Sequence, residues 1–376
     1  MKGSRAREPR AVDADLEGFA PVPPPAWMRW LPFAYVALVL CLEVGIRAEW
    51  AVSFFLIAVP AIAAYAYGPF VVASLTVFAI LLEGFLAAGA RHLGETHHVT
   101  ADIATAVVGV LATALALHRR RQERHLVHAN SVAEALMRTL LRPVPHQVGQ
   151  VLAAGLYRPS EAGTMVGGDL FDIRSTPSGE RAVIGDVRGK GLQAVHAVAA
   201  VLGSFREAAH EDVGLEVVAA RLERRLAREA KEIPDEELFA TALLVEYDSG
   251  AQRVRLSNHG HVEPVLISGG EVRVLDDPPV LPLGLGSLAE SDGRAVWSHP
   301  LAPGDVLLLV TDGLVEARNH SGVFYPLLER LAHRFGGRPA PGPAEVVDFL
   351  NTDLPRHARS LHDDVAILAI SPNAAG

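Results

Sequence analysis

Hydrophobic and polar positions divide the chain into two regions of different character. Up to about residue 118 the sequence consists of long apolar stretches with short polar segments between them, and beyond it short apolar runs alternate with polar turns. The apolar stretches cover residues 31–46, 51–67, 70–90 and 99–117. Each holds about 16 to 21 residues, close to what a helix needs to cross ~30 Å of hydrocarbon. We therefore expect four transmembrane helices within residues 30–118.

Positively charged residues are concentrated on one side of these stretches. The segments before the first and after the fourth stretch carry Lys2, Arg5, Arg7, Arg10, Arg29, Arg119, Arg120, Arg121 and Arg124. The intervening outer loops carry only Arg47 and Arg91. The positive-inside rule then predicts a multi-pass protein of the cell membrane, embedded in lipid, with both termini cytoplasmic. Residues 1–29 lack the signal-peptide pattern and are expected to be a disordered cytosolic leader; buried helices of a soluble protein are the alternative for the shorter stretches.

Three acidic residues lie within or beside these stretches: Glu43, Glu83 and Asp102. Carboxylates are costly in lipid, which makes them candidate functional groups, although Glu43 and Asp102 would be hydrated if they lie near the outer interface. Glu83 is expected to lie deeper. The second outer loop carries His92, His97 and His98, which would suit a pH or metal sensor or have no such role. Cys41 is the only cysteine, which excludes a disulfide within the chain.

The segment at residues 119–145 is predicted to be a helical linker that ends at Pro143 and Pro145. Apolar residues recur at alternating spacings of three and four at Leu126, Ala129, Ala133, Leu136 and Leu140. This spacing is typical of a short coiled coil and would support a homodimer. Because it covers only about two heptads, a single amphipathic helix packed on the following domain is the alternative.

Residues 146–372 combine strand-like runs with helices grouped in pairs. Strands are expected at 151–159, 170–175, 181–187, 238–248, 252–258, 263–268, 271–275, 305–312 and 363–370, and helices at 192–209, 214–231, 324–335 and 344–355. This order predicts an α+β domain with sheets inside and helices outside.

Aspartates stand at the ends of several of these apolar runs. They are Asp169 and Asp172 in MVGGDLFDI, Asp186 in RAVIGDVRGKG, Asp312 in LLLVTDGLVEA, and Asp363 and Asp364 in HDDVAILAI. One such aspartate is ordinary turn chemistry, but several distant ones indicate a shared site. Clustered carboxylates repel one another and are costly to desolvate unless a cation lies among them. A pair of divalent metal ions would satisfy that requirement.

Other chemistries fit the sequence less well. GDVRGKGL lacks the GxxxxGK[ST] spacing of a phosphate loop, with Gly191 in place of the hydroxyl residue, and no GxSxG elbow is present. His259 and His261 lack partners at zinc-ligand spacing, and the sequence around them is typical of a turn. The formal net charge of −9 and the lack of a long basic stripe argue against nucleic-acid binding. Oxygen ligands suit Mg²⁺ or Mn²⁺.

Six motifs, in this order, resemble the SpoIIE-type branch of the type 2C, metal-dependent protein serine/threonine phosphatases: VGGDLFD, GDVRGKGLQA, FATALLVEYD, SNHGHVEPVLI, LLLVTDGLVEA and HDDVAILAI. The resemblance covers residues 140–371. It implies an αββα sandwich that holds two Mn²⁺ or Mg²⁺ ions between its sheets and removes phosphate from serine or threonine without a covalent enzyme intermediate. Members of this branch often act on phosphorylated anti-sigma-factor antagonists.

The resemblance also implies roles for individual residues. Asp169, Asp186, Asp312 and Asp363 would be the catalytic metal ligands, with the Val187 carbonyl a further ligand and Asp364 able to exchange roles with Asp363. Asp172 would lie just outside the metal ligands. No counterpart of the family's phosphate-binding arginine is evident, which leaves Lys190 and Arg158 as candidates for contact with phosphate.

The chain departs from the family pattern in one loop. Where the family has Asn-Ala-Gly-His-Pro-Pro, this chain has Asn258-His259-Gly260-His261-Val262-Glu263, which would alter the loop near the cleft. The function expected is a membrane-anchored protein serine/threonine phosphatase acting on a phosphorylated regulatory protein. The alternatives are a signalling or scaffold protein that keeps the fold without turnover, and a transporter bundle regulated by the domain.

Overall fold

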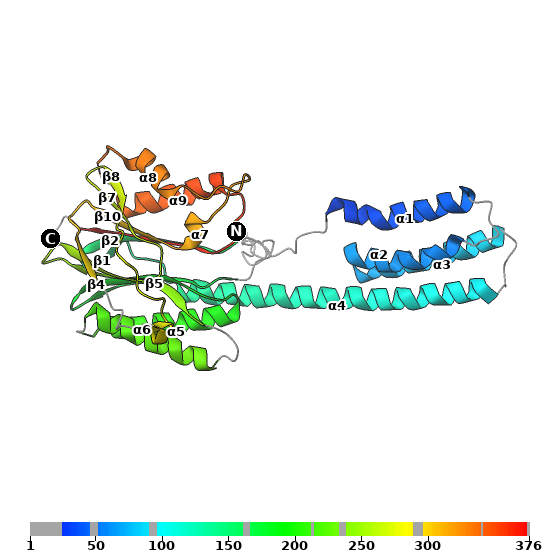
Figure 1. The fold of residues 1–376 in the computed structure, drawn as a ribbon, viewed down its shortest axis with the longest axis horizontal. Helices are drawn as coiled ribbons and strands as arrows, with labels where there is room; N and C mark the ends of the chain where they lie inside the picture. The colour runs from blue at the N-terminus through cyan, green and yellow to red at the C-terminus, as the bar shows by residue number, and fades with distance from the viewer. Residues whose placement is uncertain are drawn as a thin grey trace, which may run out of the picture. The chain divides into compact units, whose positions relative to one another are not determined.

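The computed structural model describes residues 25–45, 52–89, 96–160, 166–211, 214–232, 238–288, 296–339 and 341–373. The chain forms two compact units, residues 1–128 and 129–376, each of which is treated by itself (Figure 1). The expected leader up to residue 24 and His92 lie outside the described residues, as do the side chains of His97 and His98.

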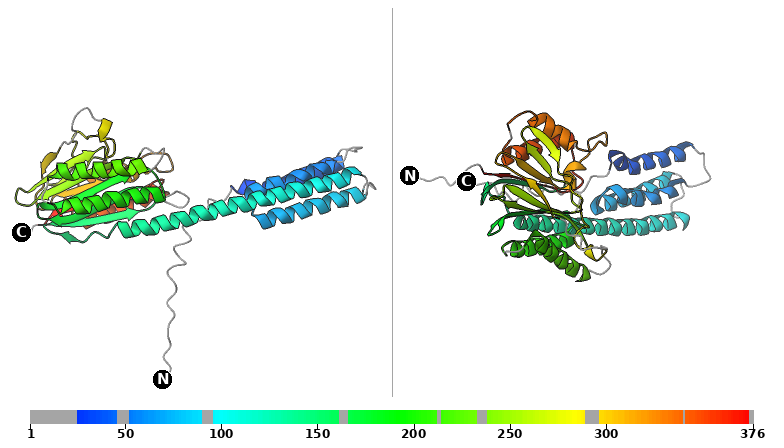
Figure 2. Two further views of the ribbon diagram at one scale, coloured as in Figure 1. Left: turned by 90° about the horizontal axis from the view of Figure 1, so that it is seen from below. Right: turned by 60° about the vertical axis from the view of Figure 1, so that its left-hand side comes forward.

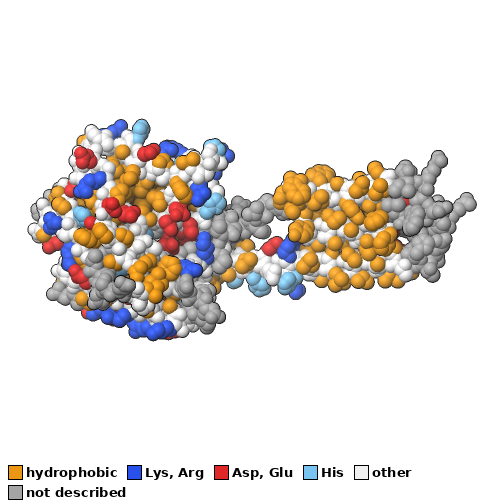
Figure 3. All heavy atoms as spheres, viewed as in Figure 1, with side chains coloured by type: hydrophobic (Ala, Val, Ile, Leu, Met, Phe, Trp, Pro, Cys, Tyr) orange, Lys and Arg blue, Asp and Glu red, His pale blue; other side chains and the backbone are white. Residues whose placement is uncertain are grey.

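The described part of the N-terminal unit consists of helices and short connections. Its elements are α1 (Ala26–Gly45), the 3-10 helix η2 (Val52–Ala58), α2 (Val59–Ala66), α3 (Pro69–Gly89) and the first part of α4 (Thr96–Leu140). Three of these helices, α1, α3 and α4, are long and apolar enough to cross a membrane. Hydrophobic side chains cover the visible face of this unit (Figure 3). Phe70 and Phe85, for example, are 82% and 74% exposed, which is unusual for a soluble protein and typical of a lipid-facing surface.

The second apolar stretch differs from the single long helix that was expected. It consists of η2 followed by α2, and the two together run from residue 52 to 66. Pro60 lies in the first turn of α2, where its missing N–H needs no partner. At the other end of α2, the guanidinium of Arg119 donates to the carbonyl oxygens of Ala64 and Tyr65, at 2.9 and 2.6 Å. These bonds satisfy carbonyl groups that the helix end leaves without intrahelical donors.

The helix α4 joins the fourth apolar stretch and the linker without a break. The side chains of Ala133, Met137 and Leu141, spaced four residues apart, are buried in the core of the C-terminal unit. Leu126 and Leu136, by contrast, are 58% and 45% exposed. The end of α4 therefore packs as an amphipathic helix on its own domain, which was the alternative to the coiled coil, and dimerisation stays a prediction.

The C-terminal unit contains two antiparallel sheets. The first has the order β1-β2-β11-β10-β7-β8 and the second β3-β4-β5-β6-β9. The strands of the first sheet are β1 (Gln147–Val148), β2 (Val151–Arg158), β7 (Val265–Ser268), β8 (Glu271–Val274), β10 (Val306–Val310) and β11 (Val365–Pro372). Those of the second are β3 (Asp169–Thr176), β4 (Gly179–Val187), β5 (Ala240–Asp248), β6 (Arg253–His259) and β9 (Trp297–Pro300).

Helices cover the outer faces of both sheets. They are α5 (Leu192–Ala209) and α6 (Leu215–Glu232) on the second sheet, and α8 (Leu327–Phe335) and α9 (Pro343–His357) on the first (Figure 1). The short η3 (Gly286–Leu288) and α7 (Asp312–Val315) complete the unit. In the view from below, α5 and α6 lie side by side across the second sheet (Figure 2). The predicted four-layer αββα arrangement is thereby confirmed.

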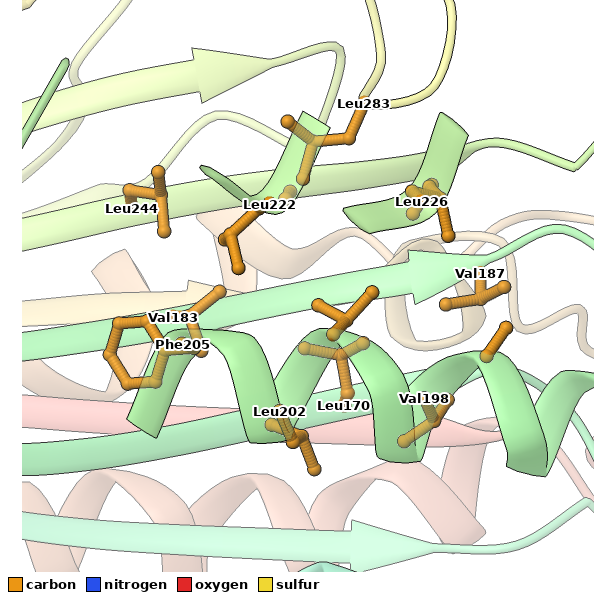
Figure 4. Packing of buried hydrophobic residues seen from close by; sticks show 14 of the residues in the cluster. Leu170, Val183, Val187, Val198, Leu202, Phe205, Leu222, Leu226, Leu244 and Leu283 are labelled. Atoms are coloured by element: carbon orange, nitrogen blue, oxygen red, sulfur yellow. The ribbon is translucent and has the colours of Figure 1, made fainter. Parts of the chain in front are cut away.

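Three buried clusters hold these layers together. One fills the space between the sheets with residues such as Phe171, Ile184 and Leu368. A second lies between the second sheet and its helices, where Leu170, Val183 and Leu244 meet Leu202, Phe205 and Leu222 (Figure 4). The third lies under α8 and α9. Because both faces of each sheet are buried, the central strands are continuous apolar runs. The short strands β1 and β9 and the one-turn helix α7 were not predicted from the sequence.

Candidate metal centre

Two aspartates face each other across neighbouring strands of the second sheet. Asp169 is the first residue of β3 and Asp186 is next to the last of β4, and the two are directly paired in the antiparallel register. Asp169 shares its face of β3 with Phe171, and Asp186 shares its face of β4 with Ile184. Both of these apolar residues belong to the cluster between the sheets. The two carboxylates therefore point toward the space between the sheets, at one end of the sandwich.

Asp312 reaches the same place from the first sheet. The apolar strand β10 ends at Val310, and Asp312 begins α7 directly afterwards. One carboxylate oxygen from each of Asp169, Asp186 and Asp312 lies within 4.8 Å of the others. The glycine of the Asp-Gly pair has a steric reason, since a Cβ on Gly313 would come 1.8 Å from the Asp364 carbonyl oxygen. The sequence therefore brings α7 against the start of β11.

The three carboxylates are held where their charges are unfavourable. Burial, followed by the charge of Asp186, raises the pKa of Asp169 well above its usual value, and burial together with Asp363 raises the pKa of Asp312. Burial, followed by the charges of Asp312 and Asp363, raises the pKa of Asp186 to about 7. The positive charge of Lys190 lowers the pKa of Asp186, but by less than burial and the neighbouring carboxylates raise it. The anionic forms need a cation, and an all-carboxylate donor set fits a hard divalent ion.

The neighbouring residues Asp363 and Asp364 have different surroundings. The Asp363 side chain is 51% exposed, lies 3.4 Å from the Lys190 ammonium and lines a cavity next to Asp312. Asp364 is 1% exposed and accepts hydrogen bonds from the Tyr157 hydroxyl at 2.5 Å and from the backbone N–H groups of Ser160 and Gly167, both at 2.9 Å. The Asp364 carboxylate is thus fully engaged in holding the fold, and Asp363 has the freer oxygens.

Two predicted site residues lie elsewhere. Asp172 shares its face of β3 with Leu170, toward α5, where it accepts from Arg206 at 2.5 Å and Arg174 at 2.9 Å. Arg158 shares its face of β2 with Leu156 and donates to the Asn351 side-chain oxygen at 2.7 Å on α9. Strand alternation turns both side chains to the outer faces of their sheets. The expected places of Asp172 beside the metal ligands and of Arg158 at the phosphate do not fit this geometry.

Val187 keeps its expected place at the end of β4, directly after Asp186. Its N–H donates to the Gly168 carbonyl at 3.0 Å. A Cβ on Gly168 would come 2.0 Å from the Val187 carbonyl oxygen, so the glycine pair before β3 allows close backbone approach here. Ligation by this carbonyl stays a prediction.

Residues that sequence reasoning missed hold the aspartates in place. The Thr311 hydroxyl donates to Asp169 at 2.7 Å and accepts from the Ala366 N–H at 2.8 Å, which links β3, β10 and β11. Thr311 directly precedes the Asp312-Gly313 pair, and this position could have identified it from the sequence as a neighbour of the site. No local signal marks Tyr157, because its partner Asp364 is 207 positions away.

The variant loop with two histidines is a turn, as predicted. Gly260 has φ +67°, and the Asn258 side chain bonds both the N–H and the C=O of His261 at 2.7 and 3.0 Å. His261 Nδ1 lies 3.0 Å from the hydroxyl of Thr241, which is the strand partner of Asp186. Burial lowers the pKa of His259 and of His261 to about 4, so both rings are neutral at pH 7. The loop therefore supports the strand beside Asp186 without adding charge.

A small cavity of about 150 Å³ gives access to the aspartates. Its lining consists of Asp312, Gly313, Glu316, Ala317, Arg318, His362 and Asp363. In the space-filling view, acidic side chains gather at the surface where Figure 1 labels α7 (Figure 3). A phosphate group on a flexible side chain is a suitable size for such an opening.

Comparison with solved structures gives similar folds. The SiaA-PP2C domain of Pseudomonas aeruginosa is 19% identical, with 68% of this chain and 98% of that chain covered and a TM-score of 0.50. The RsbU and RsbW domains of Rv1364c from Mycobacterium tuberculosis are 26% identical, with 62% and 63% covered and a TM-score of 0.49. The PP2C phosphatase domain of SpoIIE from Bacillus subtilis, solved with a fragment of its regulatory domain, is 17% identical. The match covers 60% of this chain and 64% of that chain, with a TM-score of 0.49. This chain spans less than two thirds of the last two.

Comparison with family models gives a match at residues 177–373 to the family described as stage II sporulation protein E (SpoIIE). The matched segment contains every strand from β4 to β11, and with them Asp186, Asp312 and Asp363. The C-terminal unit has the PP2C-type serine/threonine phosphatase fold. Since the family match extends over more than half of the residues of the whole chain, the chain belongs to the SpoIIE family.

Proposed function

We propose that this protein is a membrane-anchored, metal-dependent phosphatase that hydrolyses phosphoserine or phosphothreonine on a regulatory protein. The observation that carries the proposal is the convergence of three carboxylates within 4.8 Å at one end of a PP2C-type sandwich. Burial, together with mutual repulsion, raises the pKa values of Asp169, Asp186 and Asp312. Such a site is stable in its ionised form only with cations bound.

The donor set fits two Mn²⁺ or Mg²⁺ ions. Asp169, Asp186, Asp312 and Asp363 would hold them, with the Val187 carbonyl as a further oxygen ligand. When bound, such a pair supplies Lewis-acid activation of water and neutralises charge on a phosphoryl group. The cluster, and not any single residue, is therefore the catalytic unit.

The protein's own groups orient the substrate and the aspartates. The Thr311 hydroxyl fixes one oxygen of Asp169 at 2.7 Å, so the other oxygen keeps a defined direction. The Lys190 ammonium, 3.4 Å from Asp363 and partly exposed, would donate to a phosphate oxygen. Lys190 would then make the contact with phosphate for which no arginine is evident in the sequence.

The family supports a phosphorylated regulatory protein as the substrate. An anti-sigma-factor antagonist, on which members of this branch often act, is the substrate class we propose. All of the predicted metal aspartates are present, which argues against the alternative of a scaffold without turnover. A scaffold protein of this fold would not require the strained cluster to be kept.

We further propose that four segments cross the cell membrane and that both termini are cytoplasmic. Three helices have the required length and hydropathy. For the fourth crossing, the 3-10 helix η2 rises ~2.0 Å per residue, so η2 and α2 together extend about 26 Å. That length is close to the ~30 Å of a hydrocarbon core.

Removal of a metal ligand should abolish hydrolysis. Asp186→Asn and Asp312→Asn each lose a charge of the cluster, and we expect at least about a 100-fold loss of Mn²⁺-dependent phosphate release from a phosphoserine protein. Asp348→Asn, an exposed aspartate on α9, is the matched control and should keep full activity. Turnover by the wild type in EDTA would contradict the proposal, and its lack of turnover with Mn²⁺ would favour the scaffold alternative.

The two adjacent aspartates should fail in different ways. Asp363→Asn should weaken Mn²⁺ binding at least about tenfold and leave the melting temperature of the metal-free protein nearly unchanged. Asp364→Asn replaces one of the two oxygens that accept three hydrogen bonds with an NH2 group, which cannot accept, and should lower the unfolding free energy by about 2 kcal/mol or more. Calorimetric titration and urea denaturation measure the two effects. The reverse pattern would exchange the roles of these residues.

The metal-free protein should lose stability as pH rises. Burial and repulsion raise the pKa of Asp186 from near 4 to about 7, so the folded state binds more protons than the unfolded state between these values. The stabilising contribution is complete below pH 4 and is lost through pH 7, with a slope of up to about 1.4 kcal/mol per pH unit for each extra proton. Urea denaturation of residues 119–376 in EDTA, followed by the fluorescence of Trp297, should show this decline, and Asp186→Asn should reduce it.

Topology depends on whether η2 and α2 cross the membrane together. Four crossings place both termini on the same side, whereas three crossings place them on opposite sides. A reporter enzyme that is active only outside the cytoplasm should therefore be inactive when fused after residue 376, while a fluorescent protein fused there should fluoresce. Activity of the first fusion would exclude a cytoplasmic C-terminus and with it the arrangement proposed here.

A further inference from the structure

A second, larger cavity adjoins the one that leads to the aspartates. It has a volume of about 750 Å³, and its charged or titratable lining residues are Arg318, His320, Arg356, His357, Arg359 and His362. Two of them, Arg318 and His362, also line the aspartate cavity. The two cavities are therefore adjacent, and the larger one is lined by three permanent positive charges.

No carboxylate within the described ranges neutralises these positive charges. Among the described residues, Arg318, Arg356 and Arg359 form no ion pair with a carboxylate, whereas other arginines of the same unit do, such as Arg334 with Glu345 at 2.9 Å. Arg356 lies in the last turn of α9, where a helix end favours a cation. That effect accounts for Arg356 alone, because Arg318 and Arg359 lie in loops. The cluster thus has no carboxylate partner in the described part of the chain.

The wall of the cavity is held by specific contacts. The guanidinium of Arg318 lies 4.4 Å from the ring centre of Phe324, and the two residues form a short β-bridge. The His357 ring packs against Tyr325, with 5.4 Å between ring centres, and its Nε2 lies 3.1 Å from the Val323 carbonyl oxygen. A wall fixed in this way can present charge at low entropic cost.

We propose that this cavity binds acidic side chains of the substrate protein that flank the phosphorylated residue. The proposal rests on the phosphatase function above. Guanidinium groups bind carboxylates in planar, paired geometry, and their charge persists at every relevant pH. With the phosphate in the aspartate cavity, neighbouring residues of the same segment extend past Arg318 and His362 into the larger cavity. In Figure 3, blue and pale-blue side chains border the acidic group on this face.

Removal of two of the charges should weaken binding of acidic substrates selectively. In the full-length protein in detergent with Mn²⁺, Arg356→Gln/Arg359→Gln should raise the KM for a phosphoserine peptide with acidic flanks about tenfold. Hydrolysis of p-nitrophenyl phosphate, which has no flanking residues, should stay within about twofold. The matched control is Arg224→Gln/Arg228→Gln, which removes the same charge from the exposed face of α6 and should alter neither substrate.

A charge exchange provides the decisive arm. Arg356→Glu/Arg359→Glu should prefer a phosphopeptide with lysine flanks, reversing the preference of the wild type. Equal kcat/KM of the wild type for acidic and neutral flanks, or equal losses on the peptide and on p-nitrophenyl phosphate, would overturn the proposal. Inorganic phosphate could also inhibit hydrolysis of the peptide by the wild type and fail to inhibit the Arg356→Gln/Arg359→Gln variant. That result would overturn the proposal too, because the cavity would then bind a free anion.

A binding measurement separates this proposal from the proposed function. Fluorescence anisotropy of the labelled acidic phosphopeptide needs no turnover, and the glutamine variant should bind it about tenfold more weakly. If the wild type hydrolyses neither substrate but shows this difference in binding, the cavity is supported and the phosphatase function fails. If the wild type hydrolyses both substrates and the two proteins bind the peptide equally well, the phosphatase function is supported and the proposal for the cavity fails.

Discussion

Repulsion among buried carboxylates is the constraint around which the candidate metal centre is built. Asp169, Asp186 and Asp312 would separate or take up protons if they were free to do so, as their raised pKa values indicate. The packed core between the sheets prevents separation, because the register of β3 and β4 and the end of β10 are fixed by apolar residues far from the charges. Hydrophobic burial therefore supplies the energy that keeps the charges together until cations bind.

A second set of contacts sets the exact place of the ligands from the C-terminal strand. Asp364 accepts from Tyr157 on β2 and from two backbone N–H groups before β3, so it ties both sheets to the start of β11. The neighbouring Asp363, just before β11, lines the cavity. Gly313 lets α7 approach the same point closely. A buried, fully satisfied carboxylate thus positions an exposed one, which explains why two adjacent aspartates are needed.

The layers and the aspartate cluster could be predicted from the sequence because both depend on local pattern. The apolar run of β10, for example, ends just before Asp312, so the sequence itself marks this aspartate as lying at a strand end. The face of β3 on which Asp172 lies could not be predicted. Both faces of this strand are buried, so the sequence shows no alternation of polar and apolar residues that would distinguish them. The Tyr157–Asp364 bond depends on tertiary register across 207 positions. The break between η2 and α2 follows from Pro60, which hydropathy alone does not register.

The two adjoining cavities carry opposite charge, and this arrangement bears on how a phosphorylated substrate would approach. Four carboxylates without cations repel a phosphate, but in the proposed metal-bound state two divalent ions cancel their formal charge. The charged side chains that remain at the opening are then Glu316 and Arg318, and the arginines of the larger cavity make the total positive. An acidic phosphoprotein of the proposed kind would be attracted only in that state, since the same surface without ions presents a negative entrance. Metal occupancy would thus control substrate encounter as well as chemistry, through Coulomb forces alone.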